Sequence, residues 1–474
     1  MSRLTEALQT ENVTTKNGMT TNSSSLNECV NLFFSIGAMR GKGKDRVVSL
    51  FSKAFNEDPR TAMRILFWSR DIREGAGERQ IFRDIMSYLA SNYPQTVKTN
   101  LDLIPEYGRW DDVHVLFGTE LENDVVTLLV HGLKNPETAS LVSKWMPRKG
   151  LVFNKVRKSL KVTPKELRKL IVALSKTVEQ KMCSKRWTEI EYPKTPSLAM
   201  SRYTKAFGRN DSERFKSFIE SLKKGEVKIN AGALYPYDIT KNLRFGSNKD
   251  LANEQWKALP NWMEGSDELI LPMVDVSGSM SCTVGGNPNL TCMEVAISLG
   301  MYISERNEGA FKDMFMTFSS TPQIQKLLGP LSDRYTQLAR ADWGMSTNLY
   351  SAFKTILNQA VKFNIPQDEM PSKILILSDM EFDTAIRGER NNSALSMIDE
   401  MYEEAGYVKP GVIFWNLHAN GGNFPAKFDE NGTALISGFS PSILKSVLSN
   451  PDSLTPVNIM NETVNSERYE PVTV

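Results

Sequence analysis

Cysteine and histidine, the residues behind most zinc, haem and thiol chemistry, are scarce in this sequence. The chain has 474 residues but only four cysteines and three histidines. The cysteines form no CxxC pair, so the sequence carries neither a disulfide framework nor a zinc signature, and we expect free thiols. None of the histidines, His114, His131 and His418, has a metal-ligand spacing or a nucleophile beside it. We therefore expect no histidine-centred active site.

Long apolar runs are also missing. No stretch of 18 or more apolar residues occurs, which argues against a membrane span. The first residues, MSRLTEALQTENVTTKNG, are polar and lack the apolar core of a secretory signal. We expect a cytoplasmic protein that does not associate with membranes.

The common catalytic motifs are absent as well. The sequence has no GxxxxGK[ST], no GxSxG and no HExxH. Because Asp275 ends an apolar run, a phosphatase with an aspartyl nucleophile is an alternative, but such an enzyme needs a second acid where Ser277 stands. The protein is predicted not to be an enzyme.

Charge is unevenly distributed along a chain whose net charge is only +2. Residues 141–250 hold 26 Lys+Arg and 10 Asp+Glu, whereas residues 251–474 hold 15 and 27. A basic middle beside an acidic end suggests a polyanion site in the middle segment.

The pattern of residues divides the chain into four parts. Residues 1–25 are rich in Thr, Asn and Ser and are expected to be flexible. Residues 26–245 show helical periodicity throughout, residues 246–267 form a polar, turn-rich linker, and residues 268–474 alternate between strands and helices. We predict an all-α helical-repeat domain followed by an open-sheet α/β domain.

Three segments illustrate the helical half. Residues 58–68 and 80–89 gather their apolar residues on one helical face, and residues 164–178 carry apolar residues at i, i+3, i+4 and i+7 spacing. Turn clusters separate such runs, as in stacked helical pairs, although no fixed repeat period is visible.

In residues 268–474, short apolar strands alternate with amphipathic helices. This pattern predicts a parallel sheet covered on both faces. The expected strands are 269–276, 314–318, 374–377 and 412–417. The expected helices are 293–303, 350–363 and 394–404.

Polar residues follow the strands in a pattern that suits a metal ion. The set comprises Asp275, Ser277 and Ser279 after the first strand, Thr347 before a helix, and Asp379 after a later strand. Because parallel sheets bind ligands at the carboxyl ends of their strands, these oxygens can converge on one hard cation. Mg²⁺ is the first choice, with Mn²⁺ or Ca²⁺ as alternatives. An open position on the cation could accept a carboxylate or phosphate from a partner.

These residues and their neighbours also admit other roles. Ser277 and Ser279 could simply cap a helix, with Asp379 in a turn. Glu381 and Asp383 could assist or replace Asp379, although solvated turn residues are the more common finding. The long loop 281–292 ends in Cys282 and Cys292, which could pair if oxidised.

The order DxSxS, Thr, Asp resembles the metal-dependent adhesion site of the von Willebrand factor A family. That resemblance carries over to Asp275, Ser277, Ser279, Thr347 and Asp379 and implies an open, Rossmann-like α/β sheet. Only the loop 281–292 is longer than the family leads us to expect.

The helical half resembles the Ro-type RNA-binding module, called TROVE. The resemblance lies in FWSRDIREGAGERQIFR (67–83), LIPEYGRWDD (103–112), TPSLAMSRYTKAF (195–207) and VKINAGALYPYDI (227–239). Ro proteins join HEAT-like helical repeats, closed into a ring, to a von Willebrand A domain. Phrases such as LSDMEFD and VIFWNL place the chain nearer an uncharacterised Ro-like family of cellular and viral proteins, for which the compartment would be the host cytoplasm if viral.

The Ro resemblance implies RNA as the partner, and the basic middle supports it. Ten cations lie within 26 residues: Lys144, Arg148, Lys149, Lys155, Arg157, Lys158, Lys161, Lys165, Arg168 and Lys169. Exposed cations on one face neutralise phosphates and give salt-sensitive binding with little sequence preference. A solvated helix face is the alternative interpretation.

A second candidate patch comprises Ser201, Arg202, Tyr203, Lys205 and Arg209, where an aromatic between cations could stack a base. Core packing of Tyr203 is the equal alternative, and Asn230 is either a polar contact or a turn residue. We predict a monomeric, non-coding-RNA-binding protein whose metal site engages an acidic protein ligand. The alternative is a metal-dependent protein–protein adaptor without RNA.

Overall fold

The computed structural model describes residues 12–244, 249–318, 322–341, 347–383, 394–419, 422–449 and 454–474. The chain separates into two compact units. We call the first the sheet unit; it comprises Met1–Ile65, Tyr235–Thr240 and Asn261–Glu467. The helical unit comprises Leu66–Leu234, Lys241–Pro260 and Arg468–Val474.

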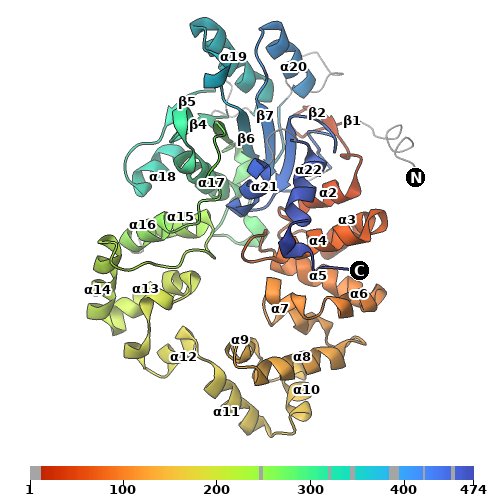
Figure 1. Ribbon diagram of the computed structural model, residues 1–474, viewed down its shortest axis with the longest axis vertical. Helices are drawn as coiled ribbons and strands as arrows, with labels where there is room; N and C mark the ends of the chain where they lie inside the picture. The colour runs from red at the N-terminus through yellow and green to blue at the C-terminus, as the bar shows by residue number, and fades with distance from the viewer. Residues whose placement is uncertain are drawn as a thin grey trace. The chain divides into compact units, whose positions relative to one another are not determined.

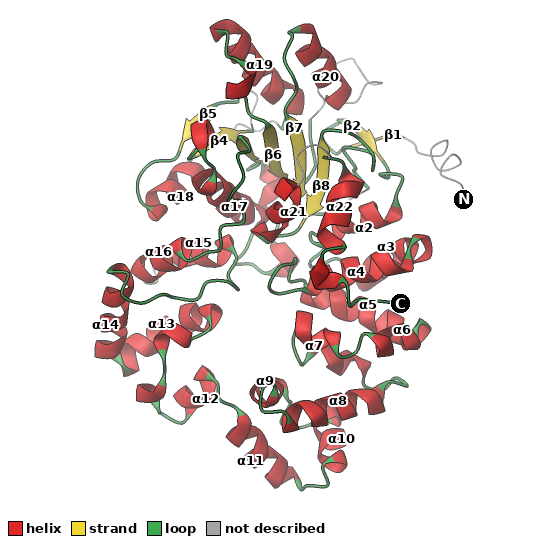
Figure 2. Cartoon of the chain, in the orientation of Figure 1, coloured by secondary structure: helices red, strands yellow, loops and turns green. Residues whose placement is uncertain are grey.

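The elements follow one another in the order shown in Figures 1 and 2. The helices are α2 (Glu28–Ile36), α3 (Lys44–Glu57), α4 (Pro59–Arg70), α5 (Arg79–Asn92), α6 (Pro94–Thr99), α7 (Leu103–Tyr107), α8 (Glu122–Lys134), α9 (Ala139–Trp145), α10 (Leu151–Ser159), α11 (Pro164–Leu174), α12 (Val178–Cys183), α13 (Ser197–Asn210), α14 (Ser212–Lys223), α15 (Pro236–Arg244), α16 (Lys249–Lys257), α17 (Cys292–Arg306), α18 (Leu331–Ala339), α19 (Leu349–Phe363), α20 (Ala394–Glu404), α21 (Leu444–Ser449) and α22 (Pro456–Val464). The strands are β1 (Asn12–Thr14), β2 (Thr20–Asn22), β3 (Ile270–Val274), β4 (Met314–Thr317), β5 (Ile324–Lys326), β6 (Lys373–Ser378), β7 (Gly411–Asn416) and β8 (Thr433–Ser437).

The sheet unit is built on a six-stranded sheet in the order β5-β4-β3-β6-β7-β8. All pairs are parallel except β4 with β5. Strands β3, β6 and β8 are buried along their whole length, as expected of strands covered on both faces. The strand order reverses between β3 and β6, where Val274 pairs with Leu377. Such a switch point is where open α/β sheets bind ligands.

Helices cover the sheet closely. Helix α17 packs on β3, β4 and β6, and its Gly300 lies so near the sheet that an added Cβ would meet Val274 Cγ2 at 2.5 Å. A capping box between Thr291 and Glu294 starts α17, which sets where the helix begins relative to β3. Helices α2 and α22 pack against β8.

The predicted strands and helices of the second half are confirmed to within three residues at each end. The prediction of a purely parallel sheet was incomplete, since the sheet is mixed. It missed β8 and the antiparallel edge strand β5, whose three residues, Ile-Gln-Lys, carry no apolar run.

The expectation of a flexible N-terminus was wrong for residues 12–25. Strands β1 and β2 form a hairpin, and Met19 and Thr21 are only 4% exposed. The Asn22 N–H donates to the carbonyl of Phe424, and the Thr15 hydroxyl donates to that of Phe382. Polar residues stay ordered here because their hydrogen bonds go to another part of the sheet unit. Residues 1–11 lie outside the described residues.

In its described residues the helical unit consists of helices joined by loops (Figure 2). One core is aromatic: Tyr192 packs on Phe207, Phe215 and Phe218 with ring centroids 5.3 Å apart in each pair. No helix in the described part of the chain is long and apolar enough to cross a membrane.

Buried ion pairs tie the first helices of this unit together. Asp112, 1% exposed, accepts from Arg70 Nε at 2.8 Å and from Arg83 Nε at 2.8 Å, and both guanidinium groups form ion pairs with it. Asp71 pairs with Arg468 and accepts from the Tyr469 hydroxyl at 2.9 Å. Position 108 has no room for a side chain larger than that of glycine, because a Cβ there would lie 2.5 Å from Asp112 Oδ2. The charged residues of segments 67–83 and 103–112 thus hold the fold together.

Two further predictions for the helical half need correction. Residues 246–267 are not simply a linker, since α16 lies within them and buries Leu251 and Trp256. The helix expected over 164–178 ends at Leu174, and Val178 begins α12. Moreover, residues 26–65 group with the sheet unit and residues 468–474 with the helical unit, so the compact units cross the boundaries drawn from the sequence.

Candidate metal centre and basic face

Asp275 and Asp379 follow β3 and β6, the two strands at the switch point of the sheet. The backbone N–H of Asp275 donates to the carbonyl of Leu377 at 3.0 Å, which continues the β3–β6 pairing. Asp275 is fully buried and Asp379 is 3% exposed. The strand pairing therefore places two buried carboxylates beside each other.

Both carboxylate oxygens of Asp275 accept hydrogen bonds. The Ser378 hydroxyl donates to Oδ2 at 2.7 Å, and the Ser277 N–H donates to Oδ1 at 2.9 Å. The Ser277 bond belongs to the tight turn that follows β3. These two donors fix the orientation of the carboxylate.

Ser277 and Ser279 complete the first loop. Their Oγ atoms lie 2.9 Å apart, and the Ser279 side chain acts to lower the pKa of Asp379 against the effect of burial. The Glu381 N–H donates to Asp379 Oδ1 at 3.3 Å. The other oxygen, Asp379 Oδ2, is buried and has no hydrogen-bond partner among the described residues. A buried carboxylate oxygen without a partner is costly, so this atom is suited to a ligand.

The electrostatics of the pair favour a cation. Burial, followed by the charge of Asp379, raises the pKa of Asp275 to about 6. Burial also raises the pKa of Asp379, against the hydrogen bonds from Ser279 and the Glu381 backbone, and the charge of Glu381 adds to the rise. A divalent cation would relieve this repulsion between carboxylates.

The donor set fits a hard cation. Two carboxylates and two hydroxyls supply oxygen only, the ligand type that Mg²⁺ and Mn²⁺ take in proteins. Asp275, Ser277, Ser279 and Asp379 are joined through hydrogen bonds and through the interaction of the two carboxylates, as the sequence predicted for residues after neighbouring strands.

Thr347 lies against the third loop. Its hydroxyl donates to the carbonyl of Glu381 at 3.1 Å and its N–H to Asp383 Oδ2 at 2.7 Å. The Asp383 N–H returns a bond to the Thr347 carbonyl at 3.1 Å. This exchange holds Thr347, which is 1% exposed, beside the segment that carries Asp379.

Glu381 and Asp383, considered as substitutes for Asp379, have other roles here. Asp383 anchors Thr347, as described, and Glu381 receives the N-terminal hairpin. The Lys16 N–H donates to Glu381 Oε2 at 2.8 Å, and the Lys16 ammonium lies 3.9 Å from Oε1. The Asn17 amide donates to the Glu381 carbonyl at 2.7 Å. The sequence offered no signal for this contact across more than 360 residues.

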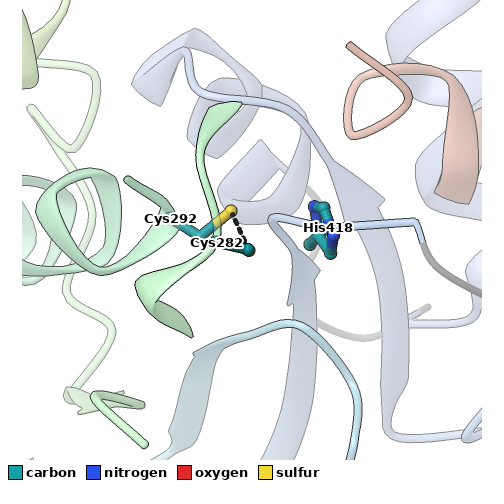
Figure 3. Close-up of side chains that lie close together, drawn as sticks. All are labelled: Cys282, Cys292 and His418. Carbon is teal, nitrogen blue, oxygen red and sulfur yellow. Dashed lines mark hydrogen bonds between the residues drawn. The ribbon is translucent and has the colours of Figure 1, made fainter. Parts of the chain in front are cut away.

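The loop 281–292 brings Cys282 and Cys292 together as free thiols. His418, at the end of β7, lies beside them (Figure 3). The sequence carries no sign of this contact of His418, because the spacing of residues along the chain does not reveal contacts between distant segments.

The basic segment of the helical unit contains two classes of cation. Lys149, Lys158, Lys161 and Lys165 are exposed, and the described residues place no carboxylate within ion-pair distance of them. Lys144 pairs with Glu179 at 3.2 Å, and Lys155 pairs with Glu122. Lys169 is exposed near Glu166, whose pKa is lowered chiefly by its bonds with Thr163.

The arginines of the segment support the backbone. Arg148 donates to the carbonyls of Ser143 and Met146, and Arg157 donates to that of Val162 at 3.2 Å. The Arg168 guanidinium lies 5.4 Å from the centre of the Phe153 ring. The lysines are therefore better candidates for phosphate contacts than these arginines.

The second patch is divided in the same way. Arg202 and Lys205 are exposed, whereas Tyr203 is half-buried and packs on Phe207, with ring centroids 6.3 Å apart. This position agrees with the core alternative for Tyr203. Asn230 Oδ1 accepts from the Gly232 N–H at 3.0 Å, a turn interaction.

Comparison with known proteins gives relatives without assigned functions. Residues 270–471 match the family described as Domain of unknown function (DUF7788), and residues 15–108 and 151–269 match Domain of unknown function (DUF2828). The first match begins at β3, just after the predicted linker. The chain is also similar to the uncharacterised protein L728 of Acanthamoeba polyphaga mimivirus, with 28% identity over 522 residues that cover 97% of this chain and 88% of the relative.

Proposed function

We propose that this protein is a non-enzymatic RNA-binding protein with a divalent-cation site for partner engagement. The observation that carries the RNA part is the group of four exposed lysines, Lys149, Lys158, Lys161 and Lys165, without carboxylate partners in the described residues. Cations that are not neutralised within the protein are available to phosphates, and their binding releases counterions.

The cation part of the proposal rests on the switch point of the sheet. A buried carboxylate oxygen without a partner, a second carboxylate with a raised pKa, and two hydroxyls gather at Asp275 and Asp379. The strand order, and the loops that carry these residues, are consistent with a von Willebrand A-like domain, Rossmann-like in topology. Mg²⁺ is the expected ion.

The pairing of a helical unit with such a sheet is also the combination that Ro-type proteins use, with HEAT-like helical repeats. Non-coding RNA is accordingly the partner class that we propose for the basic segment. At the metal site, an acidic side chain of a protein partner would complete the coordination of the cation.

Binding is favoured over catalysis by the state of Asp275. This carboxylate is fully buried and each of its oxygens already accepts a hydrogen bond, so it is poorly placed to attack a substrate. A cation held by Asp275 and Asp379 would instead serve as a Lewis acid site for an anionic group of a partner.

A purification without nuclease tests the RNA part. We expect a raised ratio of absorbance at 260 to 280 nm that falls after a high-salt wash, with RNA recovered in the wash. The same washed protein should rebind that RNA in EDTA, because the lysines act without the metal. A ratio of pure protein throughout, together with Mg²⁺-dependent capture of a protein partner, would replace this proposal with the adaptor function.

A further inference from the structure

Three side chains with soft donor atoms meet at the end of the sheet unit's central strands. Cys282 follows the loop after β3, Cys292 begins α17, and His418 follows β7 (Figure 3). Their donor atoms, two Sγ and a ring nitrogen, all lie within 4.8 Å of one another. Cys292 is buried, and Cys282 and His418 are partly exposed.

The backbone holds the two cysteines directly opposite each other. Thr283 and Thr291 form an antiparallel bridge, and the Cys292 N–H donates to the Cys282 carbonyl at 3.1 Å. The two Sγ atoms are 3.3 Å apart, too far for a disulfide and within reach of a shared ligand. The residues between them form a closed loop.

His418 is held from the other side. The backbone N–H of His418 donates to Asn416 Oδ1 at 2.9 Å. The backbone N–H of the next residue, Ala419, donates to the carbonyl of Ala38 at 3.2 Å. The Lys42 ammonium lies 3.2 Å from His418 Nε2. Because an ammonium can only donate, Nε2 accepts in this pair. Nε2 is therefore unprotonated, as a metal ligand must be, and a metal bound there would displace the Lys42 ammonium from its lone pair.

We propose that Cys282, Cys292 and His418 bind one Zn²⁺ ion through two thiolates and one imidazole nitrogen. Zinc is borderline-soft and takes sulfur and nitrogen ligands in tetrahedral geometry, at about 2.3 Å to sulfur and about 2.0 Å to nitrogen. In that geometry the two sulfurs move apart by a few tenths of an ångström relative to their present contact. A water or a group from a partner takes the fourth position.

This site is chemically distinct from the one formed by Asp275 and Asp379. Carboxylate and hydroxyl oxygens select hard cations, whereas thiolates select zinc. The two sites are nevertheless close in sequence, because Cys282 follows Ser279 by three residues and its N–H donates to the Ser279 carbonyl at 3.3 Å. Zinc bound to Cys282 and Cys292 would fix the loop 281–292 and thereby the turn that carries Ser279.

Cobalt substitution tests the proposal on the full-length, reduced protein. We expect one equivalent of Co²⁺ to produce thiolate-to-cobalt charge-transfer absorption and the visible bands of a tetrahedral ion, reversed by Zn²⁺ but not by excess Mg²⁺. Cys282→Ser and His418→Ala should each lower Co²⁺ affinity at least tenfold. Cys183→Ser, at an exposed cysteine of the helical unit, should leave the spectrum unchanged.

Circular dichroism of each variant shows whether it is folded, and the wild-type titration stands even if one variant is not. Absence of the charge-transfer band in fully reduced wild-type protein would overturn the proposal. So would a band that persists in both Cys282→Ser and His418→Ala, or a Cys282–Cys292 disulfide that forms and excludes the metal under the same reducing conditions. None of these results depends on RNA binding or on Mg²⁺.

Discussion

Asp275 and Asp379 stand at the carboxyl ends of neighbouring parallel strands, and burial together with the charge of Asp379 raises the pKa of Asp275 to about 6. A raised carboxyl pKa means that the folded protein binds protons more tightly than the unfolded chain, whose aspartates titrate near 3.8. The contribution of Asp275 to stability is therefore fully present below pH 3.8 and is lost as the pH rises through about 6. Near neutral pH the metal-free site opposes folding.

Mg²⁺ should therefore stabilise the protein in a pH-dependent manner. At pH 7.5 Asp275 is largely ionised, and a bound cation relieves a penalty of about 3 kcal/mol at most from this carboxylate. Thermal unfolding with and without Mg²⁺ should show a rise in Tm at pH 7.5 that shrinks as the pH falls below about 6. Ser279→Ala should weaken the rise, whereas Ser281→Ala, at an exposed residue in the same loop, should keep it. An equal rise at pH 5 and pH 7.5 would contradict the site.

Asp275→Asn should have opposite effects on the two forms of the protein. Without metal, removing one of two adjacent buried charges should leave Tm at pH 7.5 unchanged or raise it, because the amide still has one oxygen to accept a bond from Ser277. With Mg²⁺, the variant should gain no stability. A wild-type-like Mg²⁺ response from Asp275→Asn would remove Asp275 from the ligand set.

Charge reversal should separate the RNA-binding lysines from other surface lysines. The triple variant Lys158→Glu, Lys161→Glu and Lys165→Glu should bind RNA at least tenfold more weakly, and the slope of log K against log salt should fall by up to about three. The control variant changes the same total charge on exposed residues of the sheet unit: Lys312→Glu, Lys354→Glu and Lys362→Glu. Equal losses in both variants would indicate a general charge effect without a defined site.

The sequence predicted the elements around the candidate metal site well, because apolar runs mark buried strands. The strands ending near Asp275 and Asp379 were placed within one or two residues, and α19, capped by Asn348, begins one residue before its predicted start. Apolar periodicity carries this information locally. The short edge strand β5, exposed and without an apolar run, has no such signal.

Contacts between distant segments were beyond the reach of sequence patterns. The hairpin at Lys16 contacts Glu381, and His418 lies beside Cys282 and Cys292. These residues are far apart in the sequence, so no local spacing predicts the contacts. The polar composition of residues 12–25 wrongly predicted a flexible segment. Thr and Asn side chains there form hydrogen bonds to other parts of the sheet unit. The sequence shows the arginines of the basic segment only as positive charges. In the structure, Arg157 donates a hydrogen bond to the backbone carbonyl of Val162.

The buried ion pair of the helical unit should dominate its stability. Asp112→Ala would leave Arg70 uncompensated at 2% side-chain exposure, and breaking one partner of such a pair typically costs about 3–5 kcal/mol. Asp102→Ala, at an exposed residue without a capping bond, should change stability by less than about 0.5 kcal/mol. Chemical denaturation followed by circular dichroism measures both. Similar midpoints for the two variants would show that the Arg70–Asp112 pair contributes little.

Removing the charge of Lys42 should strengthen metal binding at the cysteine–histidine cluster. Its ammonium lies 3.2 Å from His418 Nε2, and burial lowers the pKa of Lys42, with the charge of Arg46 adding to the effect. Two thiolates already balance Zn²⁺, so a further cation beside the imidazole competes with the metal. Lys42→Met should therefore bind Co²⁺ several-fold more tightly than wild type, whereas Arg46→Met, on an exposed face of α3, should have a smaller effect. Weaker Co²⁺ binding in Lys42→Met would mean that Lys42 supports the cluster in its metal-bound form, and that His418 reaches the metal through its other nitrogen.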